Sequence, residues 1–212
     1  MNIVLIGPQG SGKGTQARLL CDKFNFFYFE SGAYLRKIAE GNSDLKKSLA
    51  AGNLVPDREM TSYLAAFLDK ENLYDNIIFD GFPRTLEQYN FFKNWLKDKS
   101  VSLDLALLLE ISEKETIRRL TARREDPATG KIYNLITDPP PPGVSIDSLV
   151  HRDDDMPEAI KKRLSLFRER TEPLITELKK DIDVFEVDGE RPIDVIAQDF
   201  EKIVSERIKK HD

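Results

Sequence analysis

The feature that most constrains the fold of this chain is a glycine-rich segment, Gly7 to Thr15, that directly follows a short apolar run. The segment reads Gly-Pro-Gln-Gly-Ser-Gly-Lys-Gly-Thr, and the pattern behind it predicts a helix over residues 13–24. Glycines let the backbone turn successive N–H groups toward a ligand, and the helix N-terminus adds positive potential. Lys13 supplies a mobile charge for outer phosphates. A glycine-rich turn with an incidental lysine is the alternative, but this order behind a strand favours a site for a nucleoside triphosphate.

Length and composition are typical of one core domain with inserted segments, because 40% of the 212 residues are hydrophobic. No apolar stretch approaches the ~20 residues that span a bilayer, and no secretory signal is recognisable, so we expect a cytoplasmic protein without a membrane partner. The single cysteine, Cys21, excludes an intramolecular disulfide, and its helical spacing with apolar neighbours favours a core position over a reactive thiol. A net charge of −5 argues against a nucleic-acid surface.

Short apolar runs alternate with longer helical patterns along the chain. We expect strands at residues 2–6, 26–29, 76–79, 105–110 and 183–187. We expect helices near residues 13–24, 32–40, 59–70, 85–98, 113–124, 156–179 and 192–209. Nearly continuous apolar strands are typical of a parallel sheet covered on both faces. The repeated order of strand and helix predicts an α/β fold of the P-loop NTPase class, with a doubly wound parallel sheet of five strands.

Two segments interrupt this pattern, residues 30–58 and residues 123–155. The second is polar and contains four consecutive prolines at 139–142. A structureless loop of this length is uncommon in a compact domain and usually serves as a lid or a binding insert. A disordered surface insertion is the alternative, but arginines at both borders argue against it. The core of this single unit is then expected to comprise residues 1–29, 59–122 and 156–212.

Two further groups stand where the strand ending near residue 79 meets the next helix. Asp80 is the carboxylate that a P-loop enzyme needs there to hold Mg²⁺ through water. Arg84 and Gln88 are four residues apart and share one helix face, so they could take a phosphate and a base edge. A simple N-terminal capping arrangement is the alternative interpretation of this pair.

Arginines also flank the 123–155 segment on both sides, at Arg119, Arg123, Arg124, Arg152 and Arg163. A solvated, salt-bridged helix face is the usual explanation of such charges. Arg119 and Arg123, however, lie one helical turn apart, and all these groups converge on Lys13 if the segment folds over the cleft. So many arginines imply more phosphate charge than one ATP carries. The pattern therefore indicates phosphoryl transfer between two nucleotides.

With these residues in place, the chain resembles the adenylate kinases, which are nucleoside monophosphate kinases, along nearly its whole length. The Gly-Lys-Gly-Thr element at 12–15 and the Asp-Gly-Phe-Pro-Arg element at 80–84 carry the resemblance together. It implies a monomer that transfers a phosphoryl group reversibly from MgATP to AMP, giving two ADP. It also implies that residues 30–58 form an AMP-binding subdomain and residues 123–155 a lid. Because this lid lacks the four cysteine positions of zinc-bearing relatives, no structural zinc is expected.

The resemblance further implies which residues hold each nucleotide. The ATP site would contain Gly10, Ser11, Gly12, Lys13, Gly14, Thr15, Arg119, Arg123, Ile132, Tyr133 and Arg191. The AMP site would contain Ser31, Arg36, Asn53, Leu54, Val55, Gly81, Phe82, Pro83, Arg84, Gln88, Arg152 and Arg163. The catalytic charges would be Lys13, Arg84, Arg119, Arg123, Arg152 and Arg163, and Asp80 would hold Mg²⁺ through water.

One departure from the family pattern concerns the metal. Ala33 stands where relatives carry a carboxylate near the water shell of Mg²⁺, so we expect activity with a weaker dependence on Mg²⁺. A UMP/CMP-type kinase is an alternative, although Gln88 and the hydroxyl of Ser31 favour adenine. A catalytically silent nucleotide-binding regulator of the same fold is a third interpretation. The presence of Lys13 and of the transfer arginines argues against it.

Overall fold

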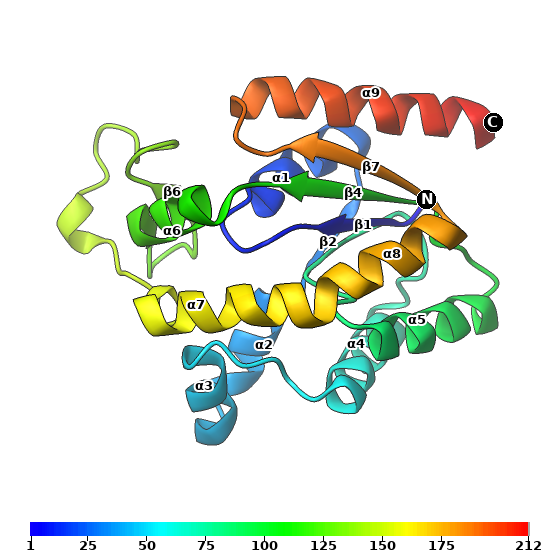
Figure 1. Cartoon of the computed structure of the whole chain (residues 1–212), viewed down its shortest axis with the longest axis horizontal. Coiled ribbons are helices and arrows are strands. Elements are labelled where there is room, and N and C mark those ends of the chain that lie inside the picture. Colours follow the sequence, from blue (N-terminus) through cyan, green and yellow to red (C-terminus); the bar gives the residue numbers. More distant parts are fainter. Residues whose placement is uncertain (212) are drawn as a thin grey trace.

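One five-stranded parallel sheet organises residues 1–211, which are the part of the chain that the computed structural model describes (Figure 1). Its strand order is β2-β3-β1-β4-β7, with β1 at Ile3–Ile6, β2 at Phe27–Glu30, β3 at Ile77–Asp80, β4 at Leu105–Glu110 and β7 at Asp183–Asp188. The prediction of a parallel α/β sheet is confirmed, and each predicted strand begins and ends within one residue of its observed bounds. Because β1 lies centrally, the glycine loop behind it emerges at the middle of the carboxyl edge, where α/β proteins bind ligands.

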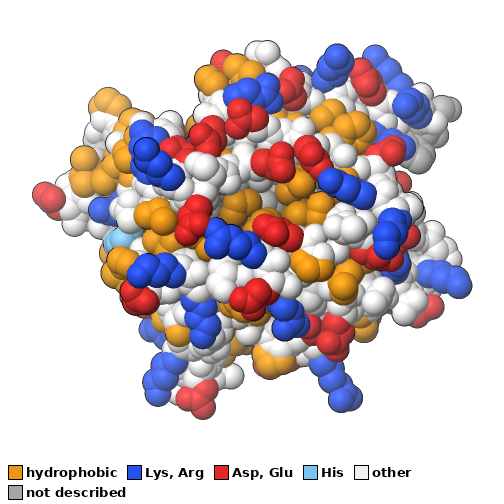
Figure 2. Space-filling model, viewed as in Figure 1, with side chains coloured by type: hydrophobic (Ala, Val, Ile, Leu, Met, Phe, Trp, Pro, Cys, Tyr) orange, Lys and Arg blue, Asp and Glu red, His pale blue; other side chains and the backbone are white. Residues whose placement is uncertain are grey.

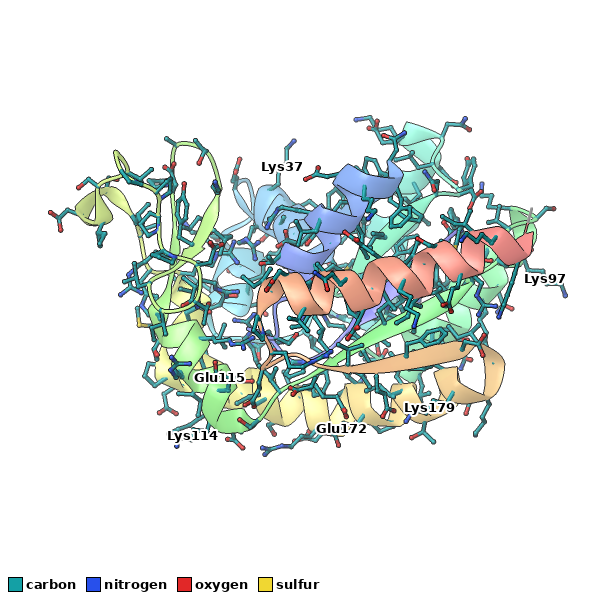
Figure 3. The ribbon with its side chains drawn as sticks, turned by 90° about the horizontal axis from the view of Figure 1, so that it is seen from above. Lys37, Lys97, Lys114, Glu115, Glu172 and Lys179 are labelled. Atoms are coloured by element: carbon teal, nitrogen blue, oxygen red, sulfur yellow. The ribbon has the colours of Figure 1, made fainter. Side chains whose placement is uncertain are left out.

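Alternate strand residues face two separate layers of helices. Ile3 and Leu5 pack with α1 (Lys13–Phe24) and α9 (Ile193–His211), which lie side by side on one face of the sheet (Figures 1 and 3). Val4 and Ile6 belong to the core on the other face, under α4 (Asp57–Glu71), α5 (Leu86–Asp98) and α8 (Glu172–Asp181). Both faces are thus covered, which explains why the strands read as continuous apolar runs.

The first inserted segment forms two short helices beside the carboxyl edge, α2 (Ser31–Ala39) and α3 (Ser43–Ala50). Leu35 and Leu45 anchor them to the main core, and the Asn42 side chain caps α3 by accepting two backbone N–H groups. Gly52 lies directly against the helix α7 (Pro157–Leu166), because a Cβ built there would lie 2.8 Å from the carbonyl oxygen of Ala159. The segment is therefore folded against the rest of the molecule.

The second inserted segment follows α6 (Glu113–Ala122) and projects from the end of the molecule opposite both termini (Figure 1). It contains an antiparallel pair, β5 (Arg123–Glu125) and β6 (Ile132–Asn134), and two 3₁₀ turns, η1 (Ile146–Ser148) and η2 (Asp153–Asp155). The predicted helix 113–124 is wrong at its end, because Arg123 has extended dihedral angles (φ −69°, ψ 138°) and begins β5. The turn from helix to strand directs the Arg123 side chain toward Asp155.

The predicted helix 156–179 is also wrong as a single element. It divides into α7, a π-helical turn η3 (Phe167–Thr171) and α8. Pro173 lies in the first turn of α8 and has no N–H to donate, so an uninterrupted α-helical ladder is impossible there. Wide turns of this kind are frequently found at functional sites. Here η3 presents Arg170 and Thr171 toward the residues around Gln88.

The surface carries both signs of charge in close alternation, and Figure 2 shows acidic and basic side chains interspersed over the whole of one face. No helix within residues 1–211 is long and apolar enough to cross a bilayer.

Candidate active site

A cavity of about 500 Å³ opens at the carboxyl edge of the sheet, where the glycine loop, the end of β3, α6, the 123–155 segment and α7 meet. It is lined by nineteen of the sequence-predicted site residues, Gly10, Ser11, Gly12, Lys13, Gly14, Thr15, Arg36, Leu54, Asp80, Gly81, Pro83, Arg84, Arg119, Arg123, Ile132, Tyr133, Arg152, Arg163 and Arg191. Residues from widely separated stretches of sequence thus meet in one place. Four of the five arginines predicted to converge here line the cavity, but Arg124 does not, because it donates to the main-chain carbonyls of Thr121 and Arg123 instead.

Five predicted residues do not line this cavity, namely Ser31, Asn53, Val55, Phe82 and Gln88. Ser31 is buried and donates its hydroxyl to the carbonyl of Gly81 at 2.8 Å. Val55 and Phe82 belong to the main core, and Gln88 is only 2% exposed. With the 30–58 segment folded against α7, the part of the site predicted for the base of AMP is covered.

The glycine loop depends on glycine at two positions, for a steric reason at Gly7 and for a positive φ at Gly12. A Cβ on Gly7 would lie 2.5 Å from the carbonyl oxygen of Leu109, and its φ of +147° is rarely adopted by other residues. Gly12, at φ +97°, begins α1, and a Cβ there would meet no atom within 4 Å. The first glycine lets the loop pass close to β4, and the second leaves space above the helix N-terminus. That space is where phosphate oxygens reach the free N–H groups.

We expect Gly7→Ala to lower the free energy of unfolding by at least about 2 kcal/mol, because backbone strain and a clash with a buried carbonyl combine. Chemical denaturation measures the change. Gly41→Ala is the matched control, since a Cβ at Gly41 meets nothing within 4 Å and its φ lies outside the positive region. Equal stabilities of the two variants would contradict the assignment of strain to Gly7.

Lys13 lies beneath the loop with its amine in contact with main-chain oxygens. Its Nζ donates to the carbonyls of Gly7 and Pro8, each at 2.8 Å. Burial lowers the pKa of Lys13 to about 8, and the nearby Arg84 and Arg163 add to this effect, while Asp80 opposes it. The buried amine therefore has too little negative charge around it, and a phosphate group would supply that charge.

Asp80 ends β3 directly beside Glu30 at the end of β2, in register across the sheet. Its Oδ2 accepts a hydrogen bond from the hydroxyl of Tyr28 at 2.8 Å. Burial raises the pKa of Asp80, and the charge of Lys13 only partly opposes the shift. Glu30 itself pairs with Arg36 at 3.1 Å, so it is engaged away from a metal.

The arginines of the cleft are held by carboxylates or carbonyls. Arg123 makes a bidentate contact with Asp155, Nε to Oδ2 at 2.7 Å and Nη2 to Oδ1 at 2.6 Å. Arg163 donates to the main-chain carbonyl of Asp154 at 2.8 Å and pairs with its side chain at 3.0 Å. Arg152 pairs with Glu125 within the 123–155 segment. These contacts hold the guanidinium groups in place before any ligand arrives.

Crowding and burial affect the charges of these arginines in different ways. Burial lowers the pKa of Arg163 to about 10, and Arg123 and Arg84 contribute, although Asp154 opposes the shift. Burial also opposes the charge of Arg123, but Asp155 more than compensates and raises the pKa of Arg123. The cluster thus carries a local excess of positive charge that anionic ligands would stabilise.

Sequence reasoning missed the acidic residues that position the arginines. Glu115 accepts from Arg119 Nε at 2.8 Å, and Figure 3 shows Glu115 on α6 next to the outward-pointing Lys114. The four-residue spacing of Glu115 and Arg119 was a usable signal for this pair. The pairing of Asp155 with Arg123 had no such signal, because 32 residues separate them in the chain.

The capping arrangement that the sequence left as an alternative for Arg84 and Gln88 is present. Thr85 caps α5 by accepting the N–H of Gln88 at 3.2 Å, and the Gln88 Oε1 accepts the N–H of Arg84 at 2.8 Å. The guanidinium of Arg84 still lines the cavity, with its Nε donating to the carbonyl of Gly81 at 2.7 Å. Capping and ligand contact are therefore compatible here.

A central strand that leads through a glycine loop into a helix, with a lysine beneath the loop, defines a P-loop nucleotide-binding protein. Residues 5–183 match the family model described as adenylate kinase. The chain belongs to the adenylate kinase family.

Three relatives named adenylate kinase match nearly the whole chain. The one from Methanothrix thermoacetophila is 35% identical over 213 residues, which cover 97% of this chain and 99% of the relative. The one from Pyrococcus furiosus is 36% identical over 204 residues, 92% of each chain. The one from Chloroherpeton thalassium is 33% identical over 218 residues, 99% of this chain and 100% of the relative.

Proposed function

We propose that this chain catalyses the reversible transfer of a phosphoryl group from ATP to AMP, giving two ADP. The observation that carries this proposal is the meeting of Lys13 and the glycine loop with Arg36, Arg84, Arg123, Arg152 and Arg163 in one cavity. One triphosphate does not need so many cations, whereas two nucleotides placed end to end do. The names of the family relatives support adenine nucleotides on both sides.

The two halves of the cleft take different nucleotides in this proposal. The loop from Gly10 to Thr15 holds the phosphates of ATP, with Arg119, Ile132, Tyr133 and Arg191 toward its base. Arg36, Arg84 and Gln88 hold AMP, with Leu54, the half-buried Asn53 and the buried Ser31, Val55 and Phe82 around it. Residues 30–58 act as the AMP-binding subdomain and residues 123–155 as the lid. Movement of α2 and α3, which leaves Asp57 at the start of α4 in place, is needed to uncover Gln88.

The chain contributes charge and position rather than covalent chemistry. Phosphoryl transfer passes through a loose transition state, so aligned reactants and neutralised oxygens account for most of the catalysis. The Lys13 amine contacts loop carbonyls, and in this proposal the phosphates of ATP replace those carbonyls as its partners. Arg123 at the start of the lid and Arg163 on α7 neutralise charge on the transferred phosphoryl group from the side opposite Lys13. Closure of the lid excludes the water that would otherwise accept the phosphoryl group.

The donor set fits Mg²⁺ bound mainly by phosphates and water. Mg²⁺ typically uses one or two protein carboxylates together with phosphate oxygens, and Asp80 offers one buried carboxylate at the loop. Within residues 1–211 no cluster of three or more His, Cys, Asp or Glu side chains is arranged to hold a metal. When bound, Mg²⁺ neutralises charge on the outer phosphates. Asp80 and the Thr15 hydroxyl are the groups that would hold it.

We expect activity that survives with a weaker dependence on Mg²⁺ than in relatives with a carboxylate at the position of Ala33. Glu30 also lines the cavity beside Asp80 but is paired with Arg36, so we expect Asp80 to provide most of the acidic contribution to the water shell. A titration of the initial rate with Mg²⁺ at fixed ATP measures this. Ala33→Asp is the companion variant, and it should raise the apparent affinity for Mg²⁺. An Mg²⁺ affinity that Ala33→Asp leaves unchanged would contradict the expectation.

A coupled assay that offers ATP with AMP, UMP, CMP or GMP separately tests the proposed activity. Turnover with AMP that greatly exceeds the other rates supports it. Preferential turnover of UMP or CMP would point to a pyrimidine nucleotide kinase. ATP binding without turnover of any acceptor would identify a silent regulator.

Both halves of the cleft come from one chain, which supports action as a monomer. We place the enzyme in the cytoplasm, where adenine nucleotides are its substrates. Sedimentation of the purified chain at a mass of 24.3 kDa would agree with the monomer.

A further inference from the structure

We infer that Asp57 is a positioning residue for the acceptor site, because it sets the orientation of the Gln88 carboxamide. This inference rests on the proposed function, in which Gln88 contacts the base of AMP. Asp57 is the first residue of α4, and its Oδ1 accepts a hydrogen bond from Gln88 Nε2 at 2.8 Å. The contact joins α4 to α5, which pack against each other beneath the cleft.

The side-chain amide of Gln88 has one fixed orientation, because its NH₂ group and its oxygen each have a partner that accepts no other arrangement. A carboxylate only accepts hydrogen bonds, so Asp57 requires the NH₂ group of the amide to face it. A backbone N–H only donates, so Arg84 requires the amide oxygen, which it contacts at 2.8 Å. The two partners agree, and each would be mismatched if the amide turned over. Gln88 is 2% exposed, so water does not compensate a mismatch there.

Asp57 is itself held in place from the opposite side. Its Oδ2 pairs with Arg170 Nη2 at 2.9 Å, and the Asp57 side chain is 8% exposed. Arg170 belongs to the π-helical turn η3, whose next residue, Thr171, donates its hydroxyl to the carbonyl of Arg84 at 3.0 Å. The wide turn therefore supports both the carboxylate and the loop that carries Arg84.

The consequence concerns the choice of base. After these contacts the amide keeps one free N–H and one free oxygen lone pair, side by side. An amide in this state matches a base edge that has an amino donor beside a ring nitrogen acceptor, which adenine has. Guanine presents a carbonyl and a ring N–H in the corresponding places, so it would require the Gln88 amide in the flipped orientation. Asp57 thus favours adenine without touching it.

Stabilisation of the α4 N-terminus by a negative charge is the simpler role for Asp57. A variant of Glu59 separates the role at the helix terminus from the role toward Gln88. Glu59 lies in the same first turn of α4 and is exposed. Among the described residues its carboxylate accepts a hydrogen bond only from the hydroxyl of Tyr63. Glu59→Gln removes the same charge without affecting Gln88. Arg170→Met removes the outer ion pair and leaves the Asp57–Gln88 contact in place.

The test measures KM for AMP, KM for ATP and kcat in the full-length enzyme. We expect Asp57→Asn to raise KM for AMP about tenfold and to lower the preference for AMP over GMP by a similar factor, with KM for ATP within about twofold. Glu59→Gln should leave KM for AMP within about twofold, whereas Arg170→Met, which removes the outer support of Asp57, should raise it by less than Asp57→Asn does. In a Gln88→Ala background, Asp57→Asn should have no further effect on KM for AMP. Melting temperatures establish that each variant is folded.

Three results would overturn the inference. The first is an unchanged KM for AMP in Asp57→Asn, and the second is an equal change in Glu59→Gln. The third is a full effect of Asp57→Asn in the Gln88→Ala background, which would show that Asp57 does not act through the amide. Wild-type turnover with AMP is the separate test of the proposed function. Calorimetric binding of AMP repeats the same comparison of variants where no turnover is measured.

Discussion

Lys13→Met should abolish turnover and at the same time raise the stability of the ligand-free protein. The loss of rate should be at least about 10³-fold, because the amine neutralises charge on the transferred group and nothing else in the loop carries a positive side chain. The gain in unfolding free energy should be about 1 kcal/mol, because burial lowers the pKa of Lys13 to about 8 and a neutral side chain escapes that cost. A coupled assay and thermal unfolding measure the two effects.

Lys23→Met is the control for this variant. Lys23 lies on the same helix but forms an exposed ion pair with Glu201 at 2.5 Å, far from the loop. We expect it to change stability by less than about 0.5 kcal/mol and to leave the rate intact. A lower melting temperature for Lys13→Met than for Lys23→Met would contradict the idea that the buried amine destabilises the free enzyme.

The stability difference should depend on pH in a definite direction. The pKa of Lys13 is about 8 in the folded protein, against 10.5 for a lysine exposed in the unfolded chain. Between pH 8 and pH 10.5 the unfolded chain therefore binds more protons than the folded protein. The free energy of unfolding of the wild type then rises with pH across that window relative to Lys13→Met. The advantage of the variant should therefore be complete below pH 8 and disappear toward pH 10.5. Chemical denaturation at pH 7, 9 and 10.5 measures it.

Arg123→Met should abolish turnover to a similar extent but should destabilise the protein. Asp155 is fully buried, and without Arg123 it keeps only a long contact with Arg163 Nη1 at 3.4 Å. An uncompensated buried carboxylate typically costs about 3–5 kcal/mol, so we expect a loss of about 3 kcal/mol. Chemical denaturation measures the loss and the coupled assay the rate.

Arg207→Met is the matched control, because Arg207 pairs with the exposed Asp183 at the far end of β7. It should change neither property by more than about 0.5 kcal/mol or twofold. Restoration of stability by the double variant Arg123→Met with Asp155→Asn, without restoration of the rate, would separate the structural role of the pair from its catalytic one. Failure of Asp155→Asn to recover stability would contradict the assignment of the loss to the unpaired carboxylate.

Most of the sheet was predictable because local pattern and burial agree there. The strands β1, β3 and β4 are short, largely apolar and buried on both faces, so their residues are apparent without knowledge of their neighbours. The π-helical turn at Phe167–Thr171 was not predictable from periodicity. It depends on Pro173 together with contacts that Arg170 and Thr171 make to Asp57 and Arg84, far away in the chain.

The candidate site divides along the same line. The sequence by itself determined the glycine loop, Lys13 and the arginines that flank residues 123–155, because phosphate chemistry restricts which residue types can stand at those spacings. Only the tertiary structure decided that Asp155 holds Arg123 and that Asp57 faces Gln88. Those pairs join residues dozens of positions apart, and a hydrogen bond depends on distance and direction in space, which spacing along the chain does not determine.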